Sequence, residues 1–121
     1  MTDYHEPPEE LDARARDFHR ALTSLKEEIE AVDWYAQRVA RATSPELRHV
    51  LDHNRREEIE HACMTLEWLR REDPEWDSAL RTYLNQKGEI VELESREADE
   101  PASSDESGVG LGIGSLRGVT Q

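Results

Sequence analysis

The most regular segment of the chain runs from Leu11 to Val39 and reads LDARARDFHRALTSLKEEIEAVDWYAQRV. Its apolar residues recur at alternating steps of four and three positions, and neither Gly nor Pro interrupts them. This spacing is typical of one long helix with a coiled-coil-like apolar seam. The seam consists of Leu11, Ala15, Phe18, Leu22, Leu25, Ile29, Val32, Ala36 and Val39.

A second segment follows over residues 45–71, and after Pro45 neither Gly nor Pro interrupts it. Ser44 is suited to cap this helix, and Pro45 is suited to its first position. Because only a few residues connect the two long helices, we expect them to fold back as an antiparallel hairpin. An Asp-Pro pair then starts a shorter third helix, predicted over residues 74–84. The predicted fold class is all-α, and because two helices cannot cover both apolar stripes, another chain must supply the missing half.

Acidic residues dominate the composition. The 121 residues include 28 Asp and Glu against 15 Lys and Arg, which gives a formal net charge of −13. Nucleic-acid binding needs clustered basic side chains, so this balance argues against it. The sequence has no run of roughly 20 apolar residues that could span a membrane, and its first residues lack the features of a secretory signal. The single cysteine, Cys63, cannot form an internal disulfide, and we expect a cytoplasmic protein.

The two ends of the chain differ from the helical part. We interpret residues 1–8 as an irregular lead-in and residues 9–88 as the helical domain. Residues 89–107 are acidic and rich in Ser, which predicts that most of them form a disordered spacer, although Glu89–Glu94 could extend a helix or strand. Residues 108–121 read GVGLGIGSLRGVTQ, a Gly-rich peptide whose possible anchors are Leu111, Ile113 and Leu116.

A candidate metal site lies in the two long helices. Glu58 and His61 are three residues apart, so on a helix both side chains point to one side and can reach one ion. Burying a carboxylate and an imidazole on an apolar stripe is costly unless they are paired or bound to a metal. In an antiparallel hairpin Glu28 falls at about the same level as Glu58, and two carboxylates with one imidazole suit iron or manganese. The alternative is that Glu58 and His61 form a solvated or locally hydrogen-bonded face.

Three segments resemble the encapsulated ferritins: KEEIEAVDWYAQR (26–38), HNRREEIEHACMTLEWLRR (53–71) and RTYL (81–84). Ferritin-like di-iron proteins use one Glu from each of two helices and a Glu-x-x-His from each of two others, and this chain holds half of that set. The sequence LGIGSLRG over residues 111–118 resembles the cargo-loading peptide that docks onto the inner wall of an encapsulin shell. On these segments the chain is identified as a member of the encapsulated ferritin family.

The resemblance implies a ferroxidase, which oxidises Fe²⁺ to Fe³⁺ with O₂ for mineralisation and storage of iron inside an encapsulin shell. It implies that two hairpins pair across a twofold axis into a ferritin-like four-helix bundle, with a di-iron centre at the interface. The implied catalytic ligands are Glu28, Glu58 and His61 of each chain. It further implies that the dimers assemble into a ring, a homodecamer, and that residues 108–121 bind the encapsulin shell protein.

The resemblance also implies further metal-contacting residues, with calcium or manganese at the positions where metal enters. Glu27, Glu30 and Trp34 match an access route, Tyr35 lies close to the ligands, and His53, Glu57 and Glu60 match a secondary set on the outer side of the second helix. Each has a simpler interpretation: the aromatic residues as interface packing, the carboxylates as a solvated face and the imidazole as a surface side chain.

Two other functions are open from the sequence. One is a di-iron peroxidase of the rubrerythrin type. The sequence lacks the Cys-x-x-Cys pair that an electron-transfer centre of that type would need, which argues against it. The other is a non-catalytic helical adaptor, in which Glu58 and His61 would be structural polar contacts.

Overall fold

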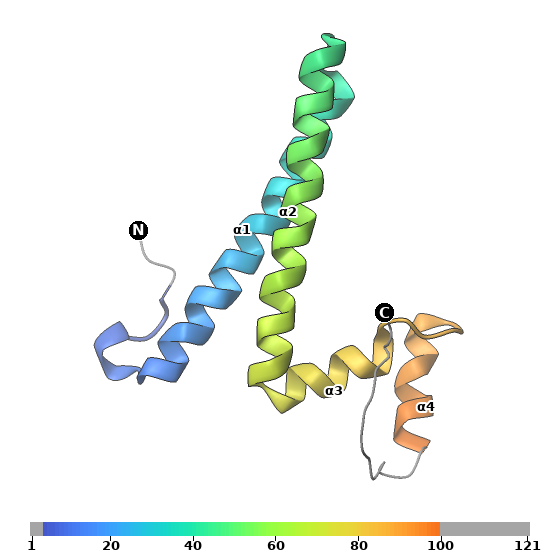
Figure 1. Ribbon diagram of the computed structural model, residues 1–121. Coiled ribbons are helices and arrows are strands. Elements are labelled where there is room, and N and C mark those ends of the chain that lie inside the picture. The colour runs from blue at the N-terminus through green and yellow to red at the C-terminus, as the bar shows by residue number, and fades with distance from the viewer. Residues whose placement is uncertain (1–3, 100–121) are drawn as a thin grey trace. The chain divides into compact units, whose positions relative to one another are not determined.

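The computed structural model describes residues 4–99, with side chains as far as Arg96, and no strand occurs among them. The prediction of an all-α fold is confirmed. The helices (Figure 1) are the 3₁₀ turn η1 (Pro8–Glu10), α1 (Ala13–Arg41), α2 (Pro45–Glu72), α3 (Pro74–Tyr83), the 3₁₀ turn η2 (Ile90–Glu92) and α4 (Leu93–Asp99). The chain divides into two compact units, Met1–Ser78 and Ala79–Gln121. None of the described helices combines the length and the apolar composition that a membrane span requires.

Local capping sets where the hairpin helices begin. Ser44 Oγ accepts a hydrogen bond from the backbone N–H of Leu47 at 3.2 Å, and Pro45 is the first residue of α2, both as predicted. The first helix starts at Ala13 and not at Leu11, because Asp12 Oδ1 accepts a hydrogen bond from the N–H of Ala15 at 2.8 Å and acts as the N-cap. An N-cap residue has non-helical backbone angles, so the seam residue before it lies outside the helix.

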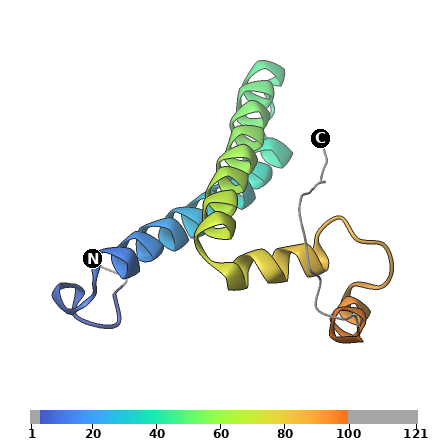
Figure 2. The ribbon, with the colours of Figure 1, turned by 60° about the horizontal axis from the view of Figure 1, so that its bottom comes forward.

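The helices α1 and α2 pack against each other as an antiparallel pair (Figures 1 and 2). Residues equally far from the turn face one another: the rings of Phe18 and Trp68 have centroids 5.3 Å apart. Nearer the open end, the Arg14 side chain forms an ion pair with Glu72, with 3.5 Å between Nη1 and Oε1. This register confirms the hairpin and sets Glu28 across from Glu58 along the helix axes.

A single chain buries few of its apolar side chains completely. Among the described side chains only Leu69, in the first unit, and Leu93, in the second, are buried. Ile29 is 56% exposed and Met64 is 63% exposed. Fully burying such a side chain is worth about 1.5–3 kcal/mol, so the single hairpin leaves a large stabilising contribution unused. Other exposed apolar side chains of the hairpin are Leu22, Trp34, Leu47, Val50, Ile59 and Trp68.

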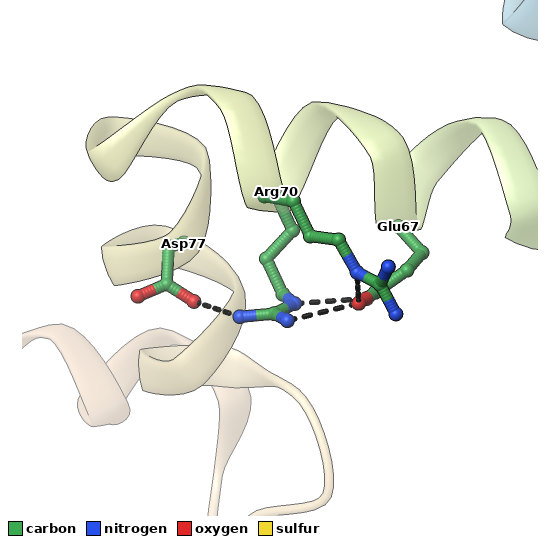
Figure 3. A network of polar contacts seen from close by, with 4 residues as sticks. Glu67, Arg70 and Asp77 are labelled. Carbon is green, nitrogen blue, oxygen red and sulfur yellow. Dashed lines mark hydrogen bonds and ion pairs between the residues drawn. The ribbon is translucent and has the colours of Figure 1, made fainter.

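An ionic network fixes the corner between α2 and α3 (Figure 3). The guanidinium of Arg70 donates to both carboxylate oxygens of Glu67 at 2.8 Å and to Asp77 Oδ1 at 2.5 Å. Arg71 Nε adds a third hydrogen bond to Glu67 at 2.7 Å. These donors, Arg70 first, lower the pKa of Glu67 from 4.5 to about 2. Glu67 and Arg70 of α2 are thereby tied to the first turn of α3.

The third helix ends one residue earlier than predicted, at Tyr83. Asn85 adopts a left-handed backbone conformation with φ of 59°, which is common just after the end of a helix and stops its continuation. The predicted start at Pro74 is confirmed, and Asp73 Oδ1 accepts a hydrogen bond from the N–H of Glu75 at 2.9 Å.

Residues 90–99 of the predicted spacer form η2 and α4 in the structure, where the sequence left a helix open for residues 89–94. Glu89 Oε1 accepts a hydrogen bond from the N–H of Glu92 at 3.2 Å and so caps the turn. The Arg96 guanidinium donates to the carbonyl oxygen of Lys87 at 2.8 Å, and Leu93 is only 4% exposed. The rest of the spacer and the peptide at residues 108–121 lie outside the described residues, as do residues 1–3 of the lead-in.

Candidate metal centre

The pair predicted on α2 is present in the structure. His61 Nδ1 lies 3.5 Å from Glu58 Oε1, across one turn of the helix. The Glu58 side chain is 26% exposed and that of His61 is 46% exposed, so both are open to solvent in the single chain. As predicted from their spacing of three residues, the carboxylate of Glu58 and the imidazole of His61 lie on one side of α2.

The third predicted ligand, Glu28, lies on the neighbouring helix α1 and is half-buried. Its Oε1 atom accepts a hydrogen bond from Thr65 Oγ1 at 3.2 Å. Thr65 follows His61 by four residues, so it belongs to the same face of α2. The sequence places Thr65 on this stripe, but a threonine within a helix has no signature that identifies it as a partner of a carboxylate.

The three predicted ligands do not form a complete metal site within one chain. In the part of the chain whose side chains are described, no group of three or more His, Cys, Asp or Glu residues could hold a metal ion. Instead, the structure gives two separate contacts, one between Glu58 and His61 and one between Glu28 and Thr65. The donors of one chain, two carboxylates and one imidazole, are half of what ferritin-like di-iron centres use.

The residues of the expected access route lie on α1. Glu27 and Glu30 are exposed, and Trp34 is 49% exposed at a shallow surface hollow that it lines with Gln37 and Arg38. Because half of its surface is open, Trp34 is not packed into the core of its own chain. Its neighbour Tyr35 is half-buried, and the Arg38 guanidinium lies over its ring, 5.1 Å from the centroid.

The secondary set lies on the exposed side of α2. His53 Nε2 is 3.1 Å from Glu57 Oε2, and these side chains are 60% and 52% exposed. Glu60 is also exposed. The structure thus brings the first two members of this set into contact and leaves all three facing solvent.

The antiparallel hairpin, with Glu28 on one helix and Glu58 and His61 on the other, has the arrangement of one half of a ferritin-like helical bundle. The sequence profile described as EncFtn-like matches residues 3–87, so the chain belongs to the EncFtn-like family. The resemblance to encapsulated ferritins is thereby confirmed.

Three similar proteins extend this result. A "Ferritin-like protein" of Thermotoga maritima is 54% identical over 113 residues, which cover 93% of this chain and 96% of that protein. An "Encapsulated ferritin-like protein" of Rhodospirillum rubrum is 49% identical over 122 residues, covering 94% of this chain and 87% of that protein. A crystal structure of a protein from Nitrosomonas europaea has a TM-score of 0.73 and 51% identity, and the match covers 74% of this chain and 99% of that one. Both the fold and the sequence of this chain are therefore ferritin-like.

Proposed function

We propose that the protein is a ferroxidase that oxidises Fe²⁺ to Fe³⁺ with O₂ at a site completed by two chains. The observation that carries this proposal is the pair of Glu58 and His61 on α2, in a hairpin whose register sets Glu28 across from it. Membership of the EncFtn-like family supports an iron-related role. In this proposal Fe²⁺ is the substrate, and each ion gives one electron to O₂.

The chemistry of the proposed ligands fits iron. Carboxylate oxygens with an imidazole nitrogen suit Fe²⁺ and Mn²⁺ better than the thiolate sets typical of structural zinc. The negative charge of Glu28 and Glu58 favours the higher charge of Fe³⁺, and His61 contributes a neutral nitrogen. His61 Nδ1 lies 3.5 Å from Glu58 Oε1, so the two side chains point to the same side of α2, where one ion could reach both.

Pairing of two hairpins supplies the other half of the ligands in this proposal. The exposed apolar side chains of α1 and α2 support pairing, because a second hairpin would remove them from water. The proposed assembly is a homodimer with two copies of Glu28, Glu58 and His61 around the iron, and a ring of such dimers, a decamer. Each such dimer would form a ferritin-like four-helix bundle, with two helices from each chain.

The residues around the proposed centre would deliver iron to it. Exposed carboxylates on an acidic chain attract Fe²⁺, and this attraction weakens as salt is added. Along this route we propose Glu27, Glu30 and Trp34, with Tyr35 near the ligands and His53, Glu57 and Glu60 as a secondary set. Calcium or manganese are the other cations we propose for the access positions.

A loading peptide at residues 108–121 would place the enzyme inside an encapsulin shell in the cytoplasm. The Rhodospirillum rubrum relative, named as an encapsulated ferritin-like protein, supports this part of the proposal. A ring of helical hairpins has no space for a mineral core, so the Fe³⁺ product would be stored within the surrounding shell.

Oxygen uptake tests the proposed reaction. Fe²⁺ is added to the full chain without air, air is admitted, and O₂ consumption is followed together with the absorbance of Fe³⁺. We expect O₂ uptake in proportion to the iron added. The rate should be at least about tenfold lower in Glu58→Ala and in His61→Ala, because losing even a hydrogen-bonding partner of a metal ligand typically costs about 10–100-fold. His49→Ala, an exposed histidine on the same helix, is the control and should match the original protein. Oxidation no faster than in buffer would contradict the proposal.

A further inference from the structure

The contact between Thr65 and Glu28 joins the two helices of the hairpin at the candidate metal centre. Thr65 Oγ1 lies 3.2 Å from Glu28 Oε1, and both residues are half-buried. An ionised carboxylate can only accept hydrogen bonds, so the Thr65 hydroxyl is the donor. A helical threonine commonly donates its hydroxyl proton to the carbonyl four residues earlier. Here the hydroxyl instead points to a side chain 37 residues away.

The direction of the side chains explains how this contact forms. Side chains on a helix lean toward its N-terminus, so the Glu28 side chain leans toward the start of α1. Because the hairpin is antiparallel, that direction leads along α2 from Glu58 toward Thr65. The carboxylate thus meets the Thr65 hydroxyl on the same face of α2 that carries Glu58 and His61.

We infer that Thr65 is a positioning residue for Glu28, which holds the carboxylate in place for a metal ion before the ion arrives. This inference rests on the proposed function. The hydrogen bond engages Oε1 and leaves Oε2 for a metal. It also orders the long Glu28 side chain beforehand, so less side-chain entropy is lost when a metal binds. Hydrogen-bonded partners of metal-ligating carboxylates typically contribute about 10–100-fold to metal affinity.

Cobalt binding to the full chain tests this role, because Co²⁺ is stable in air and its visible absorption reports its ligands. Thr65→Val removes the hydroxyl and keeps the branched shape, whereas Thr65→Ser keeps the hydroxyl. Thr23→Val is the control, since Thr23 is a half-buried threonine of α1 whose Oγ1 lies 3.5 Å from the His19 ring. The apparent Co²⁺ affinity, the absorption spectrum and the unfolding temperature of the metal-free protein are measured at one protein concentration.

We expect Thr65→Val to weaken Co²⁺ binding about tenfold or more and to alter the spectrum. Thr65→Ser should bind within about twofold of the original protein, and Thr23→Val should bind unchanged. Should Thr65→Val fail to fold, Thr65→Ala is the second variant without a hydroxyl, with the same expected loss.

Three results would overturn the inference. The first is that the variants without a hydroxyl bind Co²⁺ with the affinity and spectrum of the original protein, whether or not their unfolding temperature falls. The ferroxidase proposal would still stand in that case if the original protein consumes O₂. The second is equal loss in Thr65→Val and Thr65→Ser, which would assign the effect to packing. The third is absence of both Co²⁺ binding and Fe²⁺ oxidation in the original protein, which would also remove the proposed function.

Discussion

Nδ1 of His61 lies 3.5 Å from Oε1 of Glu58, one helical turn away on α2. The same helix face carries Thr65, whose hydroxyl is bonded to Glu28 of α1. All four residues are at least partly open to solvent in the single chain. This arrangement leaves the proposed ligands accessible to a second chain, and the consequences can be measured.

Metal should promote assembly, because in the proposed centre the ligands of both chains bind the same ions. Adding Fe²⁺ without air, or Mn²⁺, to dilute protein should shift its mass from monomer toward dimers or rings. The shift should be absent in Glu58→Ala and retained in His49→Ala. Native mass spectrometry over a series of metal concentrations measures it, and monomer alone at every concentration would disprove metal-linked pairing.

The acid stability of the hairpin should depend on Glu67. Its pKa is lowered from 4.5 to about 2 by hydrogen bonds from Arg70 and Arg71. A lowered pKa in the folded state means that the ionised form stabilises the fold above pH 4.5, and this contribution is lost as the pH falls toward 2. Glu67→Gln should unfold more easily at neutral pH by about 0.2–1 kcal/mol, since the side chain is 41% exposed and solvent screens its charge.

The difference in unfolding free energy between Glu67→Gln and the original protein should shrink from pH 5 to pH 2 and should be constant above pH 5. Urea unfolding followed by circular dichroism gives both values. A constant difference over the whole acid range would show that the network at the corner of α2 and α3 does not supply this stability.

Leu69 should matter most among the apolar residues of the hairpin for the stability of the single chain. It is completely buried, so Leu69→Ala should lower the free energy of unfolding by about 2–5 kcal/mol. Met64→Ala is the control, because Met64 is 63% exposed and should change this value by about 0.5 kcal/mol or less. Urea unfolding at a concentration below that of assembly compares the variants, and equal losses would contradict the burial found here.

Deletion of the last segment should separate activity from loading. A chain ending at residue 107 should oxidise Fe²⁺ at the original rate, because the proposed ligands all lie in α1 and α2. The same chain should no longer enter an encapsulin shell when the two are produced together. Loading of the shortened chain, measured by co-purification, or loss of its oxidase activity would contradict this division.

The hairpin could be predicted because its determinants are local. Alternating apolar steps define α1, and Ser44 with Pro45 marks the start of α2 within a few residues. The helix α4 could not be predicted beyond residue 94, because its composition resembles a disordered acidic segment, and Leu93 is its one buried side chain among those that the structure describes.

The candidate metal centre was predictable only in part. The spacing of Glu58 and His61 specifies their contact on one helix, since it depends on helix geometry alone. The bond from Thr65 to Glu28 depends on how two helices pack and on the direction of both side chains, which no local pattern encodes. The expectation that two chains share the ligands rests on the resemblance to encapsulated ferritins. The apolar periodicity shows that a helix face is apolar, but it does not show what covers that face.

In the proposed site one chain carries half of the metal ligands and a second chain supplies the other half. Anomalous diffraction at the iron edge, on crystals of the full chain grown with ferrous salt, identifies the side chains that hold iron. We expect iron peaks between Glu28, Glu58 and His61 of two neighbouring chains. Ordered iron bound by one chain alone, or these side chains without iron, would refute the shared site.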